Sequence, residues 1–490
     1  MSSPEPRIPN TVLVRLRENA GLSQQDLADE LTTLAATRYD KYPQITKKTV
    51  GRWERGEVVW PQPFYRRLLA DLFQCAGDEL GFRRPRRTHT GEDNVEPVRT
   101  WTLEPTSASS EPLVDDSQTD WWQVRAALGR HRRGLAVLAE SLHRAHRIPG
   151  LAHTGAISVP SWLPAVPIPL NEVRLTLDPS AAEPEITGDE PESTGVRPLA
   201  TIDTRYHRYH AAVRDLAAPR LFENRLCFRL MEVDWSVPGL RFGQMGFFDA
   251  VDTNEALAHE FALHHLAIDG DHETIVGRAS LRRLAFRKRL ADPFDLSRRP
   301  LMGAIGTLTI RGGTSPSIVL HQRDTTKVAG GGGMAHLLPA GIFQPSSVIP
   351  AAVAADFSIW RNIQREYAEE LLGHGEYDGS GKPIQYEKLE PFATMDQAVH
   401  EGRIQVFCLG ITLDALTFAG DILTTAVIEP DTYDELFAHT VDTNAEGSVP
   451  RQMFPFEENT LTWLANSQQL SPGAAAALHL AWTHRQHLLT

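Results

Sequence analysis

Cysteine is scarce in this chain of 490 residues, which contains only Cys75, Cys227 and Cys408. Three widely spaced thiols without a CxxC pair or a Cys/His cluster exclude a disulfide framework and a zinc site of ordinary spacing. Long apolar runs are also absent, since no window approaches the roughly 18 residues that a membrane helix needs. The first residues, MSSPEPRIPN, lack the basic and apolar regions of a secretory signal. We therefore expect a soluble cytoplasmic protein with no membrane partner.

A recognisable catalytic set is missing as well. The stretch HEFALHH (259–265) approaches the HExxH pattern of zinc peptidases, but Leu263 takes the place of the second His. His259 and Glu260 are therefore predicted to be packed polar residues of a helix. The segment AGGGGM (329–334) lacks the Lys-Ser/Thr pair of a phosphate-binding P-loop and is predicted to be a loop.

Charge is unevenly distributed along the chain. The net charge is −13, yet residues 1–90 hold 15 Lys and Arg against 11 Asp and Glu. This pattern indicates a basic segment that contacts polyanions and an acidic remainder that does not.

The length predicts several domains. A polar stretch rich in Pro, Ser and acids separates the first unit from the rest and is predicted to be a linker. We expect a multidomain chain with an all-α head, a helical or mixed middle region and an α/β C-terminal domain. The predicted boundaries are 1–82 for the head, 83–120 for the linker, 121–300 for the middle region and 301–490 for the last domain.

The head shows helical spacing interrupted by cap residues. Ser23 is placed to cap a helix that starts at Gln24, and Thr46 is placed to cap another that Gly56 ends. On the latter helix Val50 and Trp53 share an inner face. The outward residues are Lys47, Lys48, Thr49 and Arg52.

These residues form the patterns G-L-S-Q-x-x-L-A and T-x-x-x-V-x-R-W-E-x-G, which resemble the lambda-repressor/Cro-like helix-turn-helix of the XRE family over residues 11–82. The resemblance implies a homodimer that binds a double-stranded DNA operator. It departs from the family pattern between Leu31 and Gln44, where a longer second helix or loop replaces the tight turn. By the same resemblance, the DNA-binding residues are Ser23, Gln24 and Gln25 at a phosphate and Lys47, Lys48, Thr49 and Arg52 in the major groove.

The segment REYAEELLG (365–373) gathers carboxylates in the acidic C-terminal part. On an α-helix Glu366 and Glu370 share a face and Glu369 lies beside them, so three carboxylates would converge. Such a group suits Mg²⁺. An exposed acidic helix is the alternative.

The same segment resembles the second half of the Nudix box, R-E-x-x-E-E-x-G, with one extra residue before the glycine. HLLPAGIF (336–343) resembles the loop that opens the box. The family places a Gly and a Glu upstream of the Arg, where this chain has Ala351 and Phe357, so the box is stretched and lacks one carboxylate. The resemblance implies that Glu366, Glu369 and Glu370 are metal ligands or base, and that Arg365 orients them.

Together these features predict a nucleoid-associated transcriptional regulator. Its Nudix-like domain would sense a small ligand, nucleotide-like or phosphorylated. Two alternatives stay open at this point. One is an active Mg²⁺-dependent Nudix hydrolase of nucleoside-diphosphate derivatives joined to a DNA-binding head, and the other is a catalytically inactive scaffold for protein partners.

Overall fold

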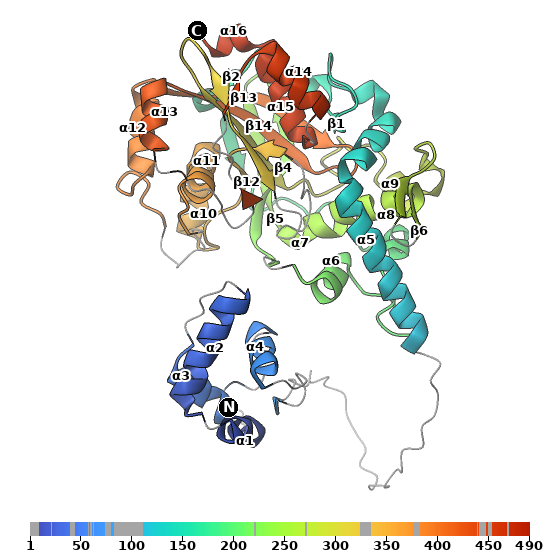
Figure 1. The fold of residues 1–490 in the computed structure, drawn as a ribbon. Coiled ribbons are helices and arrows are strands. Elements are labelled where there is room, and N and C mark those ends of the chain that lie inside the picture. Colours follow the sequence, from blue (N-terminus) through green and yellow to red (C-terminus); the bar gives the residue numbers. More distant parts are fainter. Residues whose placement is uncertain are drawn as a thin grey trace. The chain divides into compact units, whose positions relative to one another are not determined.

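The computed structural model divides the chain into two compact units, residues 1–104 and 105–490, called here the head and the body (Figure 1). Each unit is described by itself. The structure describes residues 9–490 except for 21, 40–44, 57, 59–60, 62, 74–79, 83–110, 220–221, 270–271, 324–334, 376–382, 439, 441–446, 449–452 and 468–469.

Four helices make up the described secondary structure of the head: α1 (Thr11–Asn19), α2 (Gln24–Tyr39), α3 (Lys47–Glu54) and α4 (Pro63–Phe73). Leu13, Leu27, Val50, Trp53 and Leu68 meet in one core, which takes at least one side chain from every helix. Because α2 continues to Tyr39, the long connection expected after Leu31 is largely helix.

The body contains helices along its whole length. They are α5 (Glu111–Glu140), α6 (Tyr209–Ala212), α7 (Phe247–Ala250), α8 (Ala256–His265), α9 (Ala285–Leu290), α10 (Pro350–Asp356), α11 (Ile359–Glu366), α12 (Phe392–His400), α13 (Pro430–Leu436), α14 (Glu458–Ser467), α15 (Pro472–Thr483) and α16 (Arg485–Leu488). Ser471 accepts a hydrogen bond from the Ala474 amide and so caps α15.

The strands of the body fall into several sheets. They are β1 (Ala156–Ile157), β2 (Ile168–Pro169), β3 (Arg174–Leu177), β4 (Leu226–Asp234), β5 (Gly239–Gly246), β6 (Leu266–Asp269), β7 (His272–Ile275), β8 (Gly303–Arg311), β9 (Ser317–Ile318), β10 (Leu320–Arg323), β11 (Ala335–Leu337), β12 (Ala340–Ile342), β13 (Ile404–Asp414), β14 (Gly420–Ile428), β15 (Gly447–Ser448) and β16 (Phe454–Pro455).

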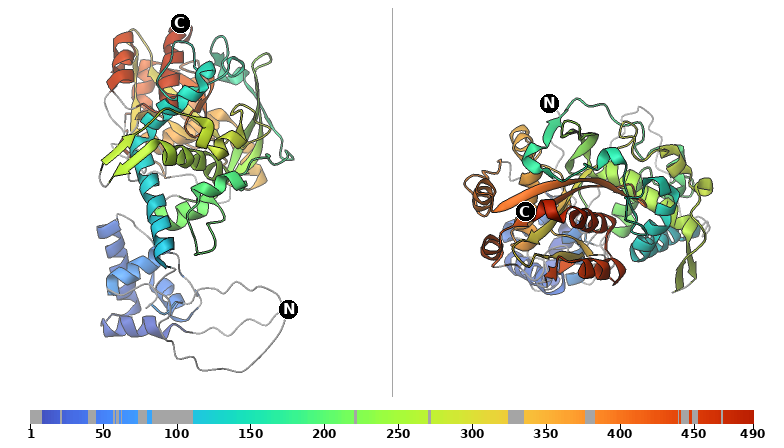
Figure 2. Two further views of the ribbon diagram at one scale, coloured as in Figure 1. Left: turned by 90° about the vertical axis from the view of Figure 1, so that its right-hand side faces the viewer. Right: turned by 90° about the horizontal axis from the view of Figure 1, so that it is seen from above.

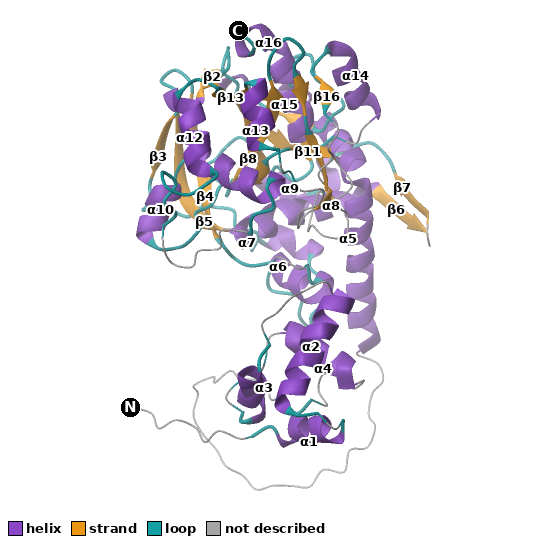
Figure 3. Ribbon diagram, turned by 60° about the vertical axis from the view of Figure 1, so that its left-hand side comes forward, coloured by secondary structure: helices purple, strands orange, loops and turns teal. Residues whose placement is uncertain are grey.

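The central sheet is mixed and has eight strands. Its main path runs β1, β13, β14, β8, β9, β16, with β12 paired to β8 and β2 paired to β13. The pairing of β13 with β14 is antiparallel, whereas β14 and β8 are parallel. Strands β3, β5 and β4 form a separate sheet, and β6 and β7 form a two-stranded ribbon (Figure 3).

The two faces of the central sheet are covered by different helices. Ile305 and Ile422 lie in a core with Ile363 of α11. Leu308 and Leu423, whose side chains point to the opposite face, lie in a second core with residues of α15. Helix α15 packs on one side of β13 (Figure 2). Alternating side chains thus place α11 and α15 on opposite faces, in a mixed α/β arrangement.

Two expected boundaries differ from the structure. Helix α5 begins at Glu111, inside the segment predicted to be a linker to residue 120, because Leu113 and Trp121 belong to one continuous helix. The middle region is mixed, which is one of its two expected forms, since it contains β1 to β7 as well as helices. No boundary divides the body at residue 300, because the strand β4 of the middle region packs against β8 in a shared core.

Candidate functional site

Helix α3 of the head separates an inner from an outer face. Val50 and Trp53 are buried, and Trp53 packs against Tyr65 of α4 with 5.5 Å between ring centroids. Lys47, Lys48 and Arg52 are exposed. The buried face fixes the helix, so the three cations are held on a rigid outer surface.

Thr49 differs from its three neighbours. Its amide donates to the Thr46 hydroxyl over 3.3 Å, and its own hydroxyl accepts from the Thr46 amide, also over 3.3 Å. These bonds form a capping box that starts α3, as Thr46 predicts. The Thr49 hydroxyl therefore has a local partner in addition to its predicted role on DNA.

Ser23 and Gln25, two of the three polar residues at the start of α2, also have local partners. The Ser23 hydroxyl accepts from the Asp26 amide, and the Ser23 amide donates to the Asp26 carboxylate over 2.8 Å. The Ser23 hydroxyl and, after it, the Ser23 amide stabilise the charged carboxylate and so lower the pKa of Asp26. The Gln25 amide group donates to Asp29, also over 2.8 Å. A phosphate at this helix start would have to share the site with the Asp26 carboxylate.

Gln24 points into the head toward a carboxylate that the sequence reading missed. Glu54, at the end of α3, is only 5% exposed. It accepts hydrogen bonds from Gln24 Nε2 over 2.5 Å and from Arg17 Nε over 2.6 Å. Since these residues lie on α2, α3 and α1, Glu54 ties the three helices together. The nearest sequence signal is the Glu that follows Trp53 in the helix-turn-helix pattern.

In the body, the REYAEELLG segment does not follow a single α-helix. Helix α11 ends at Glu366 and continues as a π-helical turn, η8 (Tyr367–Leu371). A π-helical turn is wider than an α-helical one, because its hydrogen bonds join residues five positions apart. Tyr367 anchors the turn by donating to the Thr309 hydroxyl of β8 over 2.8 Å.

The three glutamates differ in burial and in the atoms that they contact. Glu370 is 5% exposed and accepts a hydrogen bond from the Ala340 amide of β12 over 3.0 Å. Glu366 packs against Gly341, where a Cβ would lie 2.0 Å from Oε1, and accepts from Asn362 over 3.4 Å. Glu369 is half-buried. Glu366 and Glu370 therefore both lie against β12, on one side of the segment, although the segment is not a continuous α-helix.

A metal group is not evident in the described part of the chain, where no three His, Cys, Asp or Glu side chains are arranged to hold an ion. Glu370 does have a histidine nearby, since His321 Nδ1 lies 3.9 Å from Glu370 Oε1. A Mg²⁺ ion at Glu366, Glu369 and Glu370 stays a prediction from the sequence.

Arg365 has a carboxylate partner that the motif spacing missed. Asp356, at the end of α10, is fully buried and lies 3.6 Å from Arg365 Nη1. It also accepts hydrogen bonds from the Ser346 hydroxyl and the Tyr386 hydroxyl, both over 2.6 Å. Asp356 directly precedes Phe357, the position at which counting residues found no acid. Arg365 thus orients a buried network rather than the three glutamates.

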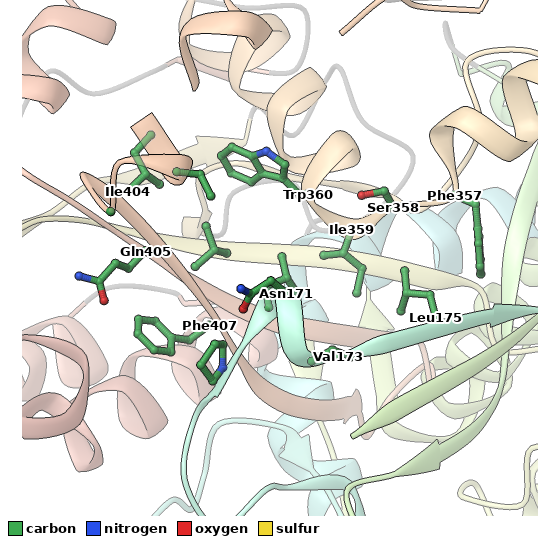
Figure 4. A pocket seen from close by; sticks show the side chains of 15 residues that line it. Asn171, Val173, Leu175, Phe357, Ser358, Ile359, Trp360, Ile404, Gln405 and Phe407 are labelled. Carbon is green, nitrogen blue, oxygen red and sulfur yellow. The ribbon is translucent and has the colours of Figure 1, made fainter. Parts of the chain in front are cut away.

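A cavity lies elsewhere in the body, at the opposite end of α11. It is a groove of about 540 Å³ between the segment that leads into β3, the start of α11 and β13. Figure 4 shows Trp360, Asn171 and Gln405 facing this space from those three segments. All its lining side chains are apolar or neutral. Because they come from distant parts of the chain, no local pattern could have indicated the groove.

The HEFALHH segment is packed, as its spacing predicts. His259 stacks on Trp121 with 5.5 Å between centroids, and its Nδ1 lies 3.0 Å from the Tyr209 hydroxyl. Burial lowers the pKa of His259 to about 3. Glu260 accepts from the backbone amides of Phe286 and Arg287. The predicted AGGGGM loop lies outside the described residues.

Comparison with known proteins adds no assignment: no protein-family model matches the chain, and no curated protein matches it. Among the helices of the described residues, none combines the length and the apolar character needed to cross a membrane.

Proposed function

We propose that this chain is a DNA-binding transcriptional regulator whose body binds a small effector. The supporting observation is the outer face of α3, where Lys47, Lys48 and Arg52 are exposed while the opposite face is fixed in the core. A helix of this kind can enter the major groove and contact phosphates and guanine edges. The basic balance of residues 1–90 favours the approach to DNA.

A single head of this size offers few base contacts. We therefore propose a homodimer on a pseudo-palindromic operator, acting on chromosomal DNA in the cytoplasm. The resemblance of the head to XRE-family regulators supports this geometry.

The test is selection of a duplex from a random pool by the full-length protein, followed by affinity measurements. Lys48→Ala and Arg52→Ala should each weaken binding by about tenfold or more, and the parent's affinity should fall steeply with salt. Arg15→Ala, which removes an exposed arginine of α1, is the matched control and should retain affinity. Unchanged binding in both α3 variants would refute α3 as the reading helix.

The effector part of the proposal rests on the groove at the start of α11. Its volume of about 540 Å³ lies in the range of small-molecule sites. With no charged side chain in its lining, the groove favours a neutral and largely apolar ligand over a phosphorylated one. Asn171, Ser358 and Gln405 would orient such a ligand by hydrogen bonds.

A thermal-shift screen of neutral small molecules tests this part. A compound that stabilises the parent saturably should not stabilise Val406→Trp, which fills the groove. Val166→Trp, at an exposed position outside the groove, should behave as the parent. Metal-dependent hydrolysis of nucleotides that Glu369→Gln and Glu370→Gln abolish would instead support an enzyme. Neither stabilisation nor turnover would favour a scaffold.

A further inference from the structure

Four cationic or titratable side chains gather around Phe418 and Phe294 of the body. His143 and His146 lie on the 3-10 helix η1 (Ser141–His146), Arg287 on α9 and Arg299 in the segment before β8. These four residues, which come from three segments, are called here the cationic cluster.

Ring contacts hold the cluster together. The Arg287 guanidinium lies 4.3 Å from the Phe418 centroid, and that of Arg299 lies 5.8 Å from it. The His143 ring meets the edge of Phe418 at 5.3 Å between centroids. His146 stands 6.1 Å from His143. One phenyl ring therefore contacts both arginines and one histidine.

Polar atoms without a hydrogen-bond partner concentrate in this cluster. Five such buried atoms belong to the cluster, while others lie elsewhere in the described part of the chain. The five are His143 Nε2, His146 Nδ1, Arg287 Nε and both Nη atoms of Arg299. Buried polar atoms in native proteins are almost always satisfied by protein, water or ligand. A group of five in one place therefore calls for a specific partner.

The partners that the arginines do have are backbone carbonyls. Arg287 donates to the carbonyls of Ala415 and Leu416, and Arg299 Nε donates to that of Pro293 over 2.9 Å. Neither forms an ion pair with a described residue, although both are at most 2% exposed. Two guanidinium groups are thus buried without a contacting carboxylate.

The electrostatic effect of this burial is large. Desolvation lowers the pKa of Arg287 to about 10 and that of Arg299 to about 9. Glu260 and Asp414 oppose the shift at Arg287, and Asp292 opposes it at Arg299, without cancelling it. Desolvation and the charges of Arg287 and His146 lower the pKa of His143 to about 4. An anion placed here would offset the desolvation of these groups and the repulsion between their positive charges.

We propose that the cationic cluster binds the oxyanion of a small acid, a carboxylate or phosphate group, with both Arg299 Nη atoms as its main donors. A guanidinium presents two N–H groups in a fork that matches two oxygens of such an anion. His143 and His146 are only partly buried, so η1 provides the side from which the anion enters. None of the four residues lines the groove, and the proposal is independent of DNA binding.

Thermal unfolding of the full-length protein in sodium phosphate, sodium acetate and sodium chloride at equal ionic strength tests the site. At least one oxyanion should raise the melting temperature of the body's transition by a few degrees relative to chloride, and the rise should saturate with concentration. A larger effect of phosphate would identify a phosphorylated ligand, and a larger effect of acetate a carboxylate. Because phosphate also stabilises proteins by exclusion from their surface, the variants decide the result.

Arg299→Met should abolish the saturable rise. Arg298→Met is the matched control and should retain the rise. Arg298 is the next residue in the chain, but it pairs with Glu185 over 2.9 Å. Lys48→Ala should also retain it, which separates the site from phosphate binding by the head. Should Arg299→Met not fold, Arg299→Lys keeps the charge without the fork and should weaken the apparent affinity. An equal response in the parent and the Arg299 variant, or no response beyond chloride, would overturn the proposal.

Discussion

Helices α3 and α11 both carry short charged motifs, but they place them differently. On α3 the cations Lys47, Lys48 and Arg52 are exposed. On α11 and the turn that follows it, Arg365 and Glu370 are each 5% exposed and bonded inside the body. The first set can contact a partner without changing the fold, whereas the second set is part of the packing.

The difference teaches that a motif's residue types do not fix its role. A charged side chain in water contributes little to stability and remains available to a ligand. The same side chain in the interior must be matched by its surroundings, and removing its partner leaves a costly buried charge. Arg365 illustrates the second case, because its donors serve Gln344, Asn362 and Asp356.

The largest effect should come from breaking the buried pair. Arg365→Met or Asp356→Asn should lower the body's free energy of unfolding by about 3 kcal/mol, because each leaves a polar network incomplete. Arg52→Met, the same change on α3, should alter stability by no more than about 0.5 kcal/mol while weakening DNA binding. Urea unfolding of the full-length protein, resolved into its transitions, measures both.

Equal stability losses for Arg365→Met and Arg52→Met would contradict the claim that the charged residues of α11 support the fold while those of α3 do not. An unfolding curve unchanged by Asp356→Asn would show that this carboxylate does not support Arg365.

A smaller effect is expected from the glycine that packs against the turn after α11. In Gly341→Ala the new Cβ would lie 2.0 Å from Glu366 Oε1, so the carboxylate or β12 must shift, at a cost of roughly 1–3 kcal/mol. Gly129→Ala in α5 is the control, since the added Cβ would meet no atom within 4 Å beyond its chain neighbours and the backbone of its own helix. It should stabilise the protein by about 0.5–1 kcal/mol, because alanine favours helix. Thermal unfolding that ranks the two variants in the opposite order would contradict the packing of Glu366.

The sequence predicted the head's helices closely because its signals are local. Ser23 and Thr46 cap α2 and α3 at the predicted positions, and Val50 and Trp53 face the core. Caps and helical periodicity act over a few residues, so they can be read without knowing the fold. The role of Gln24 could not be read this way, because its partner Glu54 is thirty residues away in the chain.

The body was harder to predict because its determining contacts are distant. The parallel pairing of β14 with β8 joins segments more than one hundred residues apart. Tyr367, in the π-helical turn after Glu366, bonds to Thr309 of β8, a contact that spacing alone does not contain. The same applies to Arg299, whose neighbour Phe418 belongs to the turn between β13 and β14.

The smallest effect should come from the start of α2, where the exposed carboxylate of Asp26 accepts a hydrogen bond from the Ser23 amide. Folding lowers the pKa of Asp26, so its stabilising contribution is present above the ordinary value of 3.8 and is lost as pH falls through the lowered value. Asp26→Asn should therefore lower the head's melting temperature slightly at neutral pH, and the difference from the parent should vanish in acid. Glu18→Gln, an exposed acid at the end of α1, should show no such convergence. A difference that persists below the lowered pKa would mean that Asp26 stabilises the head through its shape and not through its charge.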